Sequence, residues 1–336
     1  MRRLSLLCIV LLLLLTGCSA SEPCRRELMA MDTFMTLSVY AQSPAAGEAL
    51  LEEAAGEIRR LEGLLSVTDP GSEIYQANHG GAVSLSEPVR ELLEKALELC
   101  RETGGALDVT VYPAVRAWGF TTGEYRVPEE AELSALVERV GYGRVSLDGD
   151  RLALPEGVEL DLGSVGKGWT GDRLTALFRE AGVSSAIMEL GGNVQALGTK
   201  PDGSPWRVAV QAPGGGYAGV LEIADKAVVT SGGYQRYFEQ DGETYIHIID
   251  PATGRPARTG LASVTIVADS GLQGDGLSTA LFVMGREKAE AFWRRNPEFD
   301  FILLGEDGTA AITEGLEECF SLYGGWVGRP LEIIRK

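Results

Sequence analysis

The sequence predicts an α+β fold, a single compact domain built on a mixed sheet. Segments with strand-like and helical patterns are interleaved along the chain. The strand-like segments between residues 186 and 268 come as a run, which favours a mixed sheet over a doubly wound parallel one. The 336 residues contain no repeat of fixed period and no long linker, so one globular unit is expected.

The composition is that of a globular protein and argues against a nucleic-acid binder. Hydrophobic residues make up 45% of the chain and charged residues 23%, so a sizeable core is expected. The formal net charge is −18, whereas binding to a phosphate backbone requires a basic surface. The 43 glycines are scattered rather than periodic, which predicts many tight turns.

The first residues have the pattern of a secretory signal. Two arginines precede an apolar run over residues 4–15, which is too short to span a bilayer comfortably. The following "LTGC" resembles the bacterial lipobox, which implies cleavage after residue 17 and a lipid on Cys18. We therefore expect a signal peptide over residues 1–17, a lipidated tether over 18–28, and an extracytoplasmic domain over 29–336 anchored to the bacterial cell membrane. The alternative is an ordinary signal peptide with an incidental cysteine.

Three further cysteines remain in the mature chain. Cys24, Cys100 and Cys319 are an odd number and lack metal-type spacing. One disulfide is compatible with the expected compartment, but the spacing does not require it. We interpret all three as structural.

The first half of the chain alternates between predicted strands and amphipathic helices. Ser86 stands where a helix N-cap is expected, Pro88 lies in the first turn, and Gly104 ends that helix. The turn formers in residues 67–81 predict a loop. Predicted helices span residues 47–66, 86–105 and 128–142, and predicted strands span 31–41, 106–113 and two short segments within 148–163.

The second half contributes most of the predicted sheet. A helix is expected over residues 170–182, and a long helix over 274–296 is expected to break near Gly285. Residues 299–313 have the pattern of a closing hairpin. The remaining strand-like segments are 186–198, 206–213, 219–232 and 244–250.

A glycine-rich stretch, "DLGSVGKGWTGD", suggests a phosphate site. It runs from Asp161 through Lys167 into a predicted helix, and free backbone amides at a helix N-terminus attract phosphate. It lacks both the G-x-x-x-x-G-K-[ST] and the G-x-G-x-x-G patterns, so an ATP loop is not expected. A plain strand–turn–helix corner is the alternative interpretation.

Asp275 and Thr279 lie four residues apart near the start of the long predicted helix, and therefore on one face. A carboxylate and a hydroxyl in this arrangement can hold one Mg²⁺ ion, which fills its shell with substrate phosphates and water. The alternative is an aspartate favoured by the helix dipole beside a threonine that bonds back to its own helix.

His247, one of two histidines in the chain, lies on a predicted strand that ends in a turn. An imidazole there can act as a general base near neutral pH, although a lone histidine on a strand is more often structural. His79 lies in a predicted loop and suggests no function. Small polar residues beside glycines or at strand ends are weaker pocket candidates: Asp108, Asn193, Thr230 and Ser231.

Taken in order, these motifs resemble the ApbE family of bacterial FAD:protein FMN transferases. The resemblance covers nearly all of the chain after residue 28. It implies an α+β fold peculiar to the family. The motifs are "MDTFMTLSV", "SEIYQAN", "GGALDVTVYPAVRAWGF", "DLGSVGKGWTGDRL", "MELGGNVQALG", "VVTSGGYQRYF", "HIIDPATGRP" and "DGLSTALFVMG".

The resemblance implies a magnesium-dependent enzyme that takes FAD and transfers its FMN half to a threonine hydroxyl of another protein, releasing AMP. The acceptors that it implies are membrane-associated redox flavoproteins with a short threonine-containing motif. It implies a metal held by the Ser164 carbonyl and by Asp275 and Thr279, while Lys167 and His247 take part in the reaction. The implied FAD contacts are Met31, Ala106, Leu107, Asp108, Asp161, Lys167 and Ile249.

The chain departs from the family pattern at Thr68, where a tyrosine is usual. An aromatic ring there would cover the flavin or the adenine and exclude water, so a threonine raises the alternative of a metal-dependent FAD pyrophosphatase. A third hypothesis is a lipid-anchored flavin-binding protein without catalysis, which needs the pocket but not the metal. Asp32, where glycine is common, and Gly166, where alanine is common, are minor departures.

Overall fold

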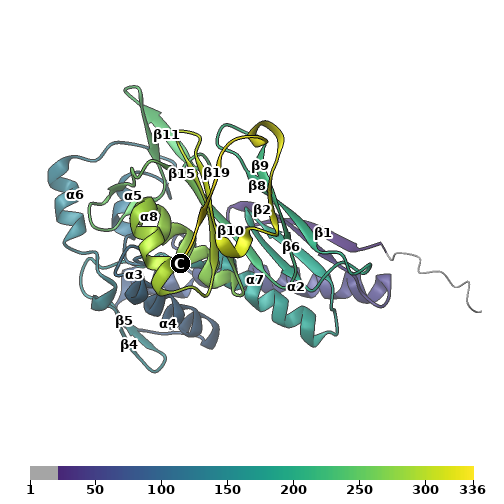
Figure 1. The fold of residues 1–336 in the computed structure, drawn as a ribbon. Coiled ribbons are helices and arrows are strands. Elements are labelled where there is room, and N and C mark those ends of the chain that lie inside the picture. Colours follow the sequence, from purple (N-terminus) through teal and green to yellow (C-terminus); the bar gives the residue numbers. More distant parts are fainter. Residues whose placement is uncertain (1–21) are drawn as a thin grey trace, which may run out of the picture.

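The computed structural model describes residues 22–336 and has the expected α+β architecture, centred on a nine-stranded sheet (Figure 1). The sheet is mixed, because β17 and β19 pair in parallel while the other neighbours are antiparallel. In spatial order its strands are β1 (Cys24–Ala30), β2 (Thr33–Val39), β6 (Ala186–Leu190), β7 (Asn193–Leu197), β10 (Ala227–Gly232), β15 (Leu261–Ala268), β16 (Asp300–Gly305), β17 (Ala310–Thr313) and β19 (Leu331–Ile334).

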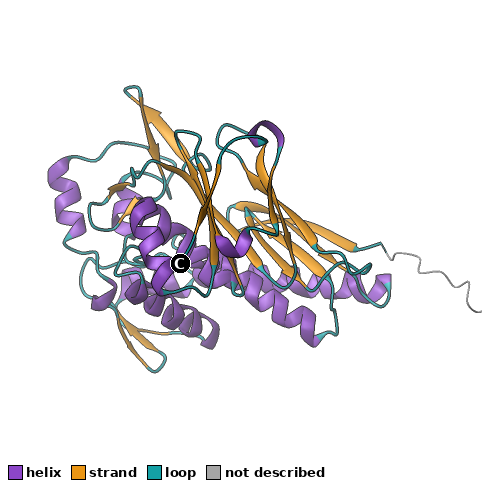
Figure 2. Ribbon diagram, viewed as in Figure 1, coloured by secondary structure: helices purple, strands orange, loops and turns teal. Residues whose placement is uncertain are grey.

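Helices cover one face of this sheet (Figure 2). The amphipathic helix α2 (Pro44–Leu65) begins at Ser43, whose hydroxyl accepts the N–H of Ala46 as an N-cap. Together with α7 (Gly163–Glu180) it packs on the first strands, and their apolar side chains form one buried cluster. The third covering helix, α8 (Gly271–Arg295), lies against β10 and β15 and contacts α7 along its first turns.

A second, smaller sheet covers part of the opposite face. It consists of β8 (Trp206–Gln211), β9 (Tyr217–Ile223) and β18 (Phe320–Leu322), in the order β18-β9-β8. Its inward side chains alternate with exposed ones, as in the buried–exposed pattern of β8. These buried residues form one core with residues of β10 and β16 that lie on the face of the large sheet turned towards the smaller sheet.

A helical region stands beside the sheet and packs against α8 through one large apolar core. The short strands around it form small separate sheets, and the β11–β12 hairpin projects from the molecule (Figure 1). The helical region and the short strands around it comprise α3 (Glu73–Gly80), β3 (Val83–Ser84), α4 (Glu87–Glu102), α5 (Tyr112–Ala117), α6 (Glu130–Val137), β4 (Ser146–Asp148), β5 (Arg151–Ala153), β11 (Tyr237–Gln240), β12 (Glu243–Ile246), β13 (Ile249–Asp250) and β14 (Arg255–Pro256).

The prediction of a strand over residues 106–113 is wrong. The segment forms a tight turn and then enters α5. The Asp108 carboxylate accepts both the N–H and the hydroxyl of Thr110, at 2.8 and 2.6 Å, and the N–H of Tyr142 at 2.9 Å. These bonds replace ladder bonds and fold the chain back, so only one isolated bridge joins Val111 to Glu159.

Two further elements differ from the prediction. The expected loop over residues 67–81 contains α3, because Ser72 caps it by accepting the N–H of Tyr75 and Ile74 is fully buried beneath it. The expected tether over residues 18–28 ends early, because Cys24–Ala30 is strand β1, paired residue by residue with β2. The folded domain therefore begins at about residue 24. The signal segment and Cys18 lie outside the described residues.

Helix α7 begins at Gly163, earlier than the prediction of 170. The glycine run is therefore not a loop but the first turns of a helix. Its Gly168 lies against the start of α8, where an added Cβ would stand 2.0 Å from the carbonyl oxygen of Gly271. Gly168 therefore serves the close packing of two helices rather than backbone flexibility.

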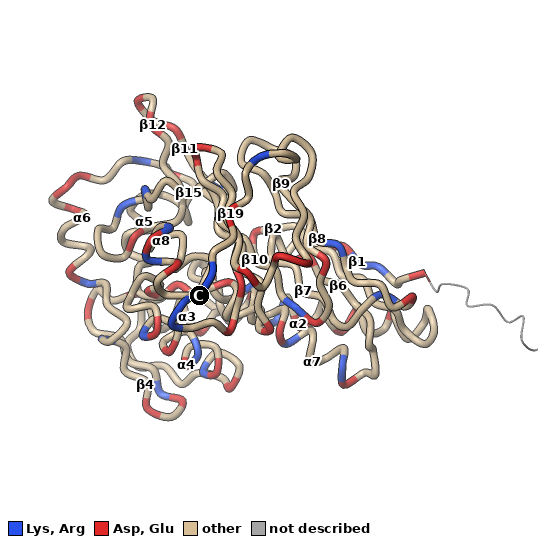
Figure 3. Tube along the Cα trace, in the orientation of Figure 1, with Lys and Arg blue, Asp and Glu red and all other residues tan. Residues whose placement is uncertain are grey.

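Within residues 22–336, no helix is long and apolar enough to cross a membrane. Acidic and basic side chains are distributed over both the helical and the sheet regions (Figure 3). The three cysteines in the described part of the chain, Cys24, Cys100 and Cys319, are all free.

Candidate active site

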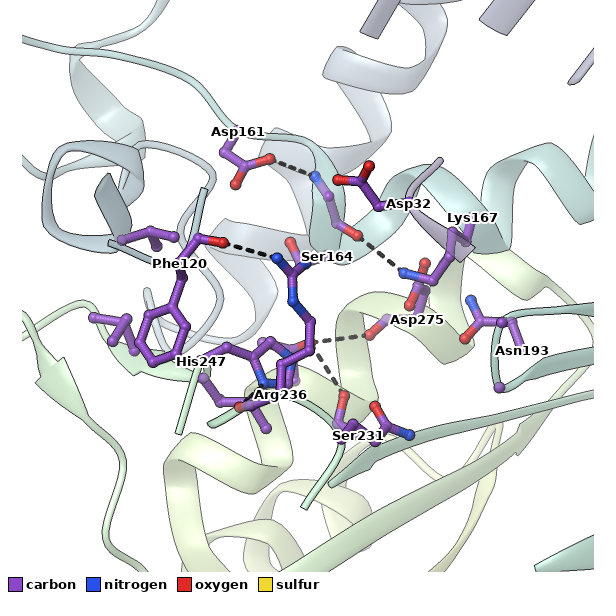
Figure 4. A pocket seen from close by; sticks show the side chains of 18 of the residues that line it. Asp32, Phe120, Asp161, Ser164, Lys167, Asn193, Ser231, Arg236, His247 and Asp275 are labelled. Carbon is purple, nitrogen blue, oxygen red and sulfur yellow. Dashed lines mark hydrogen bonds between the residues drawn. The ribbon is translucent and has the colours of Figure 1, made fainter. Parts of the chain in front are cut away.

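One cavity of about 610 Å³ collects side chains from distant parts of the chain (Figure 4). It lies where the turn after β1, the start of α7, the β6–β7 turn, the end of β10 and the first turns of α8 meet. The segment around β13 closes another side. A cavity of this size that is walled by polar groups from several elements is typical of a small-molecule site.

Almost every residue proposed from the sequence lines this cavity. Thr68 does not: it is exposed in the α2–α3 loop, where its hydroxyl lies 3.2 Å from that of Ser66. His79 also lies elsewhere, in the last turn of α3. The proposed residues in the lining are Met31, Ala106, Leu107, Asp108, Asp161, Ser164, Lys167, Asn193, Thr230, Ser231, His247, Ile249, Asp275 and Thr279.

The start of α7 presents charge and polar groups to the cavity. The Asp161 carboxylate accepts the N–H of Gly163 at 2.8 Å and so holds the first turn. Ser164 and Lys167 then lie one turn apart on the cavity side, and the Lys167 ammonium is 3.5 Å from the Gly163 carbonyl oxygen. Burial raises the pKa of the Asp161 carboxyl, against the lowering effects of the Gly163 N–H and the Lys167 and Arg236 charges.

Two contacts fix α7 relative to α8. The N–H of Gly168 donates to Oδ2 of Asp275 at 2.9 Å. Four residues further along α7, the Asp172 carboxylate receives the Ser270 hydroxyl at 2.7 Å and the N–H of Gly271 at 2.6 Å. Asp172 therefore satisfies otherwise free donors at the start of α8. Its carboxylate thereby sets the position of Asp275 against the start of α7.

Asp275 is a buried carboxylate at the wall of the cavity, with 5% of its surface exposed. Burial raises its pKa, and the nearby Lys167 ammonium and the Gly168 N–H act in the opposite direction. Thr279 stands one turn further on, with its hydroxyl 3.4 Å from both the Asp275 carbonyl oxygen and the Ser231 hydroxyl. A buried carboxylate next to hydroxyl groups is a set of hard oxygen donors.

The donor set fits a Mg²⁺ ion that also binds substrate. In residues 22–336 no group of three His, Cys, Asp or Glu side chains could hold a metal ion by itself. Mg²⁺ needs only one or two carboxylates when phosphates and water complete its octahedron. Asp275, Thr279 and Ser164 all line the cavity, which agrees with such a shared site.

Two cationic side chains, Lys167 and Arg236, and four carboxylates line the same cavity, the latter from Asp32, Asp108, Asp161 and Asp275. A diphosphate adds further negative charge. A divalent cation at this site would offset the repulsion between a bound phosphate and these carboxylates.

His247 and Arg236 are joined at the base of the β11–β12 hairpin. The Arg236 carbonyl accepts the backbone N–H of His247 at 3.1 Å and lies 3.1 Å from its Nδ1. The proton is therefore assigned to Nδ1, which leaves the Nε2 lone pair available. Burial and the positive charges of Arg236 and Lys167 lower the pKa of His247 to about 4. The imidazole is neutral at physiological pH.

Arg236 was not among the sequence candidates. It follows a turn, and its guanidinium reaches across the cavity to the Phe120 carbonyl oxygen at 2.7 Å (Figure 4). Because Phe120 is 116 residues away in the chain, no local pattern indicates this contact. The only local signal in the sequence is that this arginine lies three residues after "TSGG".

Asp32 was also missed as a pocket residue. It and Met31 form the two-residue turn between β1 and β2, with φ of 56° and 49°. Positive φ at two neighbouring non-glycine residues is uncommon and is typical of a tight hairpin turn under tertiary constraint. One such constraint is the hydrogen bond from the Met31 N–H to Glu62 at 2.6 Å.

Comparison with known proteins decides the family. The model of the ApbE family matches residues 31–303, more than half of the chain. The chain belongs to the ApbE family. A FAD:protein FMN transferase of Vibrio cholerae is 35% identical over 85% of this chain and 89% of its own length.

Solved ApbE structures share the fold. The ApbE protein of Thermotoga maritima has a TM-score of 0.83 and is 31% identical, covering 89% of this chain and 99% of its own. The flavinyl transferase ApbE of Pseudomonas stutzeri, in its apo form, has a TM-score of 0.79 and 31% identity, covering 91% and 96%. The ApbE fold thus extends over nearly the whole described chain.

Proposed function

We propose that this chain is a FAD:protein FMN transferase that uses Mg²⁺ and transfers FMN from FAD to a threonine hydroxyl of an acceptor protein, releasing AMP. One observation carries the proposal: a single cavity joins hard oxygen donors, two cations and a neutral imidazole. Relatives named FAD:protein FMN transferase and flavinyl transferase support the transfer of FMN to a protein. The proposed acceptor is a redox flavoprotein with a threonine-containing motif.

The reaction breaks one bond of the diphosphate. The acceptor hydroxyl oxygen attacks the phosphorus on the FMN side and forms a phosphoester, while the bond from this phosphorus to the bridging oxygen breaks. That oxygen leaves on AMP with the bond's electron pair. The hydroxyl proton goes to Nε2 of His247, whose Nδ1 is engaged with the Arg236 carbonyl.

The remaining cavity residues position the diphosphate and stabilise its charge. Lys167 and Arg236 place two positive charges at the wall, where they favour the added charge of the transition state. A Mg²⁺ ion held by Asp275, Thr279 and the Ser164 carbonyl would supply Lewis-acid neutralisation of the phosphates. The Asp275 carboxylate is already fixed for this by the Gly168 N–H.

The neutral state of His247 suits the role of a proton acceptor, but its low pKa makes it a weak base in the empty cavity. Bound phosphates bring negative charge, which favours the imidazolium form and raises the pKa. The base is therefore strengthened by the substrate whose reaction it assists.

We also propose that the protein acts outside the cytoplasm, anchored through lipid on Cys18. This rests on the charged-then-apolar start of the chain and the "LTGC" motif. Metabolic labelling with a fatty acid should mark the wild-type chain, and a Cys18→Ala variant should lose the label. A variant that keeps the label would refute the anchor.

The activity is tested with the purified chain, FAD, Mg²⁺ and an apo-flavoprotein domain that contains the threonine motif. We expect a fluorescent acceptor band, an acceptor mass increased by FMN, and AMP in equal amount. Free FMN and AMP with an unmodified acceptor would instead show FAD pyrophosphatase activity. FAD bound but unchanged, with no effect of Asp275→Ala, would show a flavin-binding protein without catalysis.

A further inference from the structure

The hairpin formed by β1 and β2 carries an exposed apolar pair beside the cavity. Met29 is 71% exposed and Phe34 is 58% exposed. In residues 22–336, only one other large side chain without oxygen or nitrogen is exposed to this extent, Val327 at 68%. Single exposed apolar residues are normal on a protein surface and need no explanation. Here, however, two of the three lie together on one hairpin.

The two side chains lie on the same face of the hairpin. Met29 is directly opposite Phe34 in the antiparallel register. The next pair, Ala30 with Thr33, closes the two-residue turn, so Met29 and Phe34 form the closely spaced, non-hydrogen-bonded type of pair. They are thus one small apolar surface, which we name the Met29–Phe34 pair.

This pair adjoins the cavity without lining it. The turn residues Met31 and Asp32 line the cavity, and so does Thr33, the neighbour of Phe34. Met29 and Phe34 are not among the lining residues. A ligand confined to the cavity therefore leaves the pair in water, whereas a macromolecule placed over the adjoining edge would cover it.

The charged residues on the face of the pair have no excess of positive charge, since Glu189 of β6 stands beside Thr36 on this face. Further along the same face of β1, Arg25 and Glu27 form an ion pair at 2.7 Å. The residue opposite Glu27 is the uncharged Thr36. Such a face has no excess of positive charge for anionic lipid, and an apolar protein surface matches it better.

We propose that the Met29–Phe34 pair is a docking surface for the acceptor protein, which places an apolar patch on it while its hydroxyl residue enters the cavity. The inference rests on the proposed function, because only transfer to a protein brings a macromolecule to this edge. The occupant is a folded domain whose modified residue is flanked by apolar surface side chains. The short connection through Met31–Thr33 joins the docking surface to the cavity.

The test is a double variant, Met29→Gln with Phe34→Thr, in the full chain. Both side chains are exposed, so the fold and the cavity are expected to stay intact, as checked by thermal unfolding and by FAD affinity from flavin fluorescence. The KM for an apo-flavoprotein acceptor domain should rise roughly tenfold or more, because interface contacts of this kind act through binding. The kcat at saturating acceptor should be unchanged. Val327→Thr is the matched control and should leave KM unchanged.

The outcomes separate the docking surface from the proposed function. If the wild-type chain does not modify the acceptor at all, the proposed function fails before the pair is tested. If the wild type is active and the double variant has a wild-type acceptor KM, the docking proposal is refuted. A loss of binding to phosphatidylethanolamine–phosphatidylglycerol vesicles with an unchanged KM would refute it too, in favour of a lipid contact. A lower FAD affinity would show that the pair instead supports the cavity.

Discussion

Replacement of Gly168 by alanine should disable the site by separating two helices. The added Cβ would lie 2.0 Å from the Gly271 carbonyl oxygen and 2.8 Å from the Asp275 Cβ. Real Cβ atoms essentially never approach other atoms within 3.0 Å, so α7 and α8 must move apart by about 1 Å. The obstructing atom is backbone, and it cannot rotate away as a side chain would.

The expected magnitude follows from this displacement. Overpacking of this kind typically lowers the free energy of unfolding by about 1–3 kcal/mol. The same movement stretches the 2.9 Å bond from the Gly168 N–H to Asp275 and shifts Asp275 away from Lys167 and Ser164. A misplacement of about 1 Å in a catalytic arrangement can lower the rate about 100-fold. Activity should therefore fall much more than stability.

The assay compares kcat/KM for FMN transfer with the denaturant midpoint of unfolding. The matched control is Gly166→Ala in the same helix, where the nearest atom to an added Cβ is Leu65 Cδ1 at 3.7 Å. Gly166→Ala should keep full activity and gain up to about 1 kcal/mol, because alanine favours a helix interior over glycine. Wild-type activity in Gly168→Ala would refute the view that backbone contact between α7 and α8 sets the site.

Three further predictions concern charge in the cavity. The pKa of His247 is lowered to about 4, so the imidazole of the free enzyme stays neutral well below pH 6.5. The fall of kcat/KM on the acid side should therefore occur below pH 6.5, the pKa of an unperturbed histidine. A fall centred at pH 6.5 would contradict the burial of the ring. Since the unfolded chain binds this proton more tightly, His247 should also reduce stability as the pH falls from 6.5 towards 4. Arg236→Gln removes a charge that lowers this pKa, so the acid limb should move to higher pH, whereas a purely structural role would leave it in place. Mg²⁺ with AMP is expected to raise the Tm of the wild type. Asp275→Asn should abolish this rise and lower transfer by about 100-fold or more, and an undiminished rise would exclude Asp275 as a ligand.

The periodic patterns predicted the long helices correctly, because apolar residues that recur every 3.6 residues form one helix face, and this repeat is a local property of the sequence. Helices α2 and α4 lie within about three residues of their predicted limits, and α8 is interrupted at Gly285 as expected. The pattern failed where side chains override propensity. The β-branched residues of 106–113 predicted a strand, but three donors converge on Asp108 and turn the chain.

The candidate site was predicted mainly through ordered motifs, and seven of the eight contribute residues to the same cavity, all but "SEIYQAN". Thr68 was the exception: its place in the sequence pattern did not bring its side chain to the lining. Arg236 and Asp32 were missed because their contribution arises from contacts with distant residues. No residue-by-residue pattern encodes that Arg236 reaches the carbonyl of Phe120.

The sequence by itself determined the α+β class, the family resemblance and the residue types that suit a diphosphate and a hard cation. These depend on local periodicity and on the chemistry of single side chains. Only the tertiary structure decided that the glycine run is a helix pressed against α8, that His247 is held neutral beside Arg236, and that Met29 and Phe34 adjoin the cavity in water. Close approach, desolvation and exposure are properties of the folded arrangement, because each depends on atoms that lie far apart in the chain.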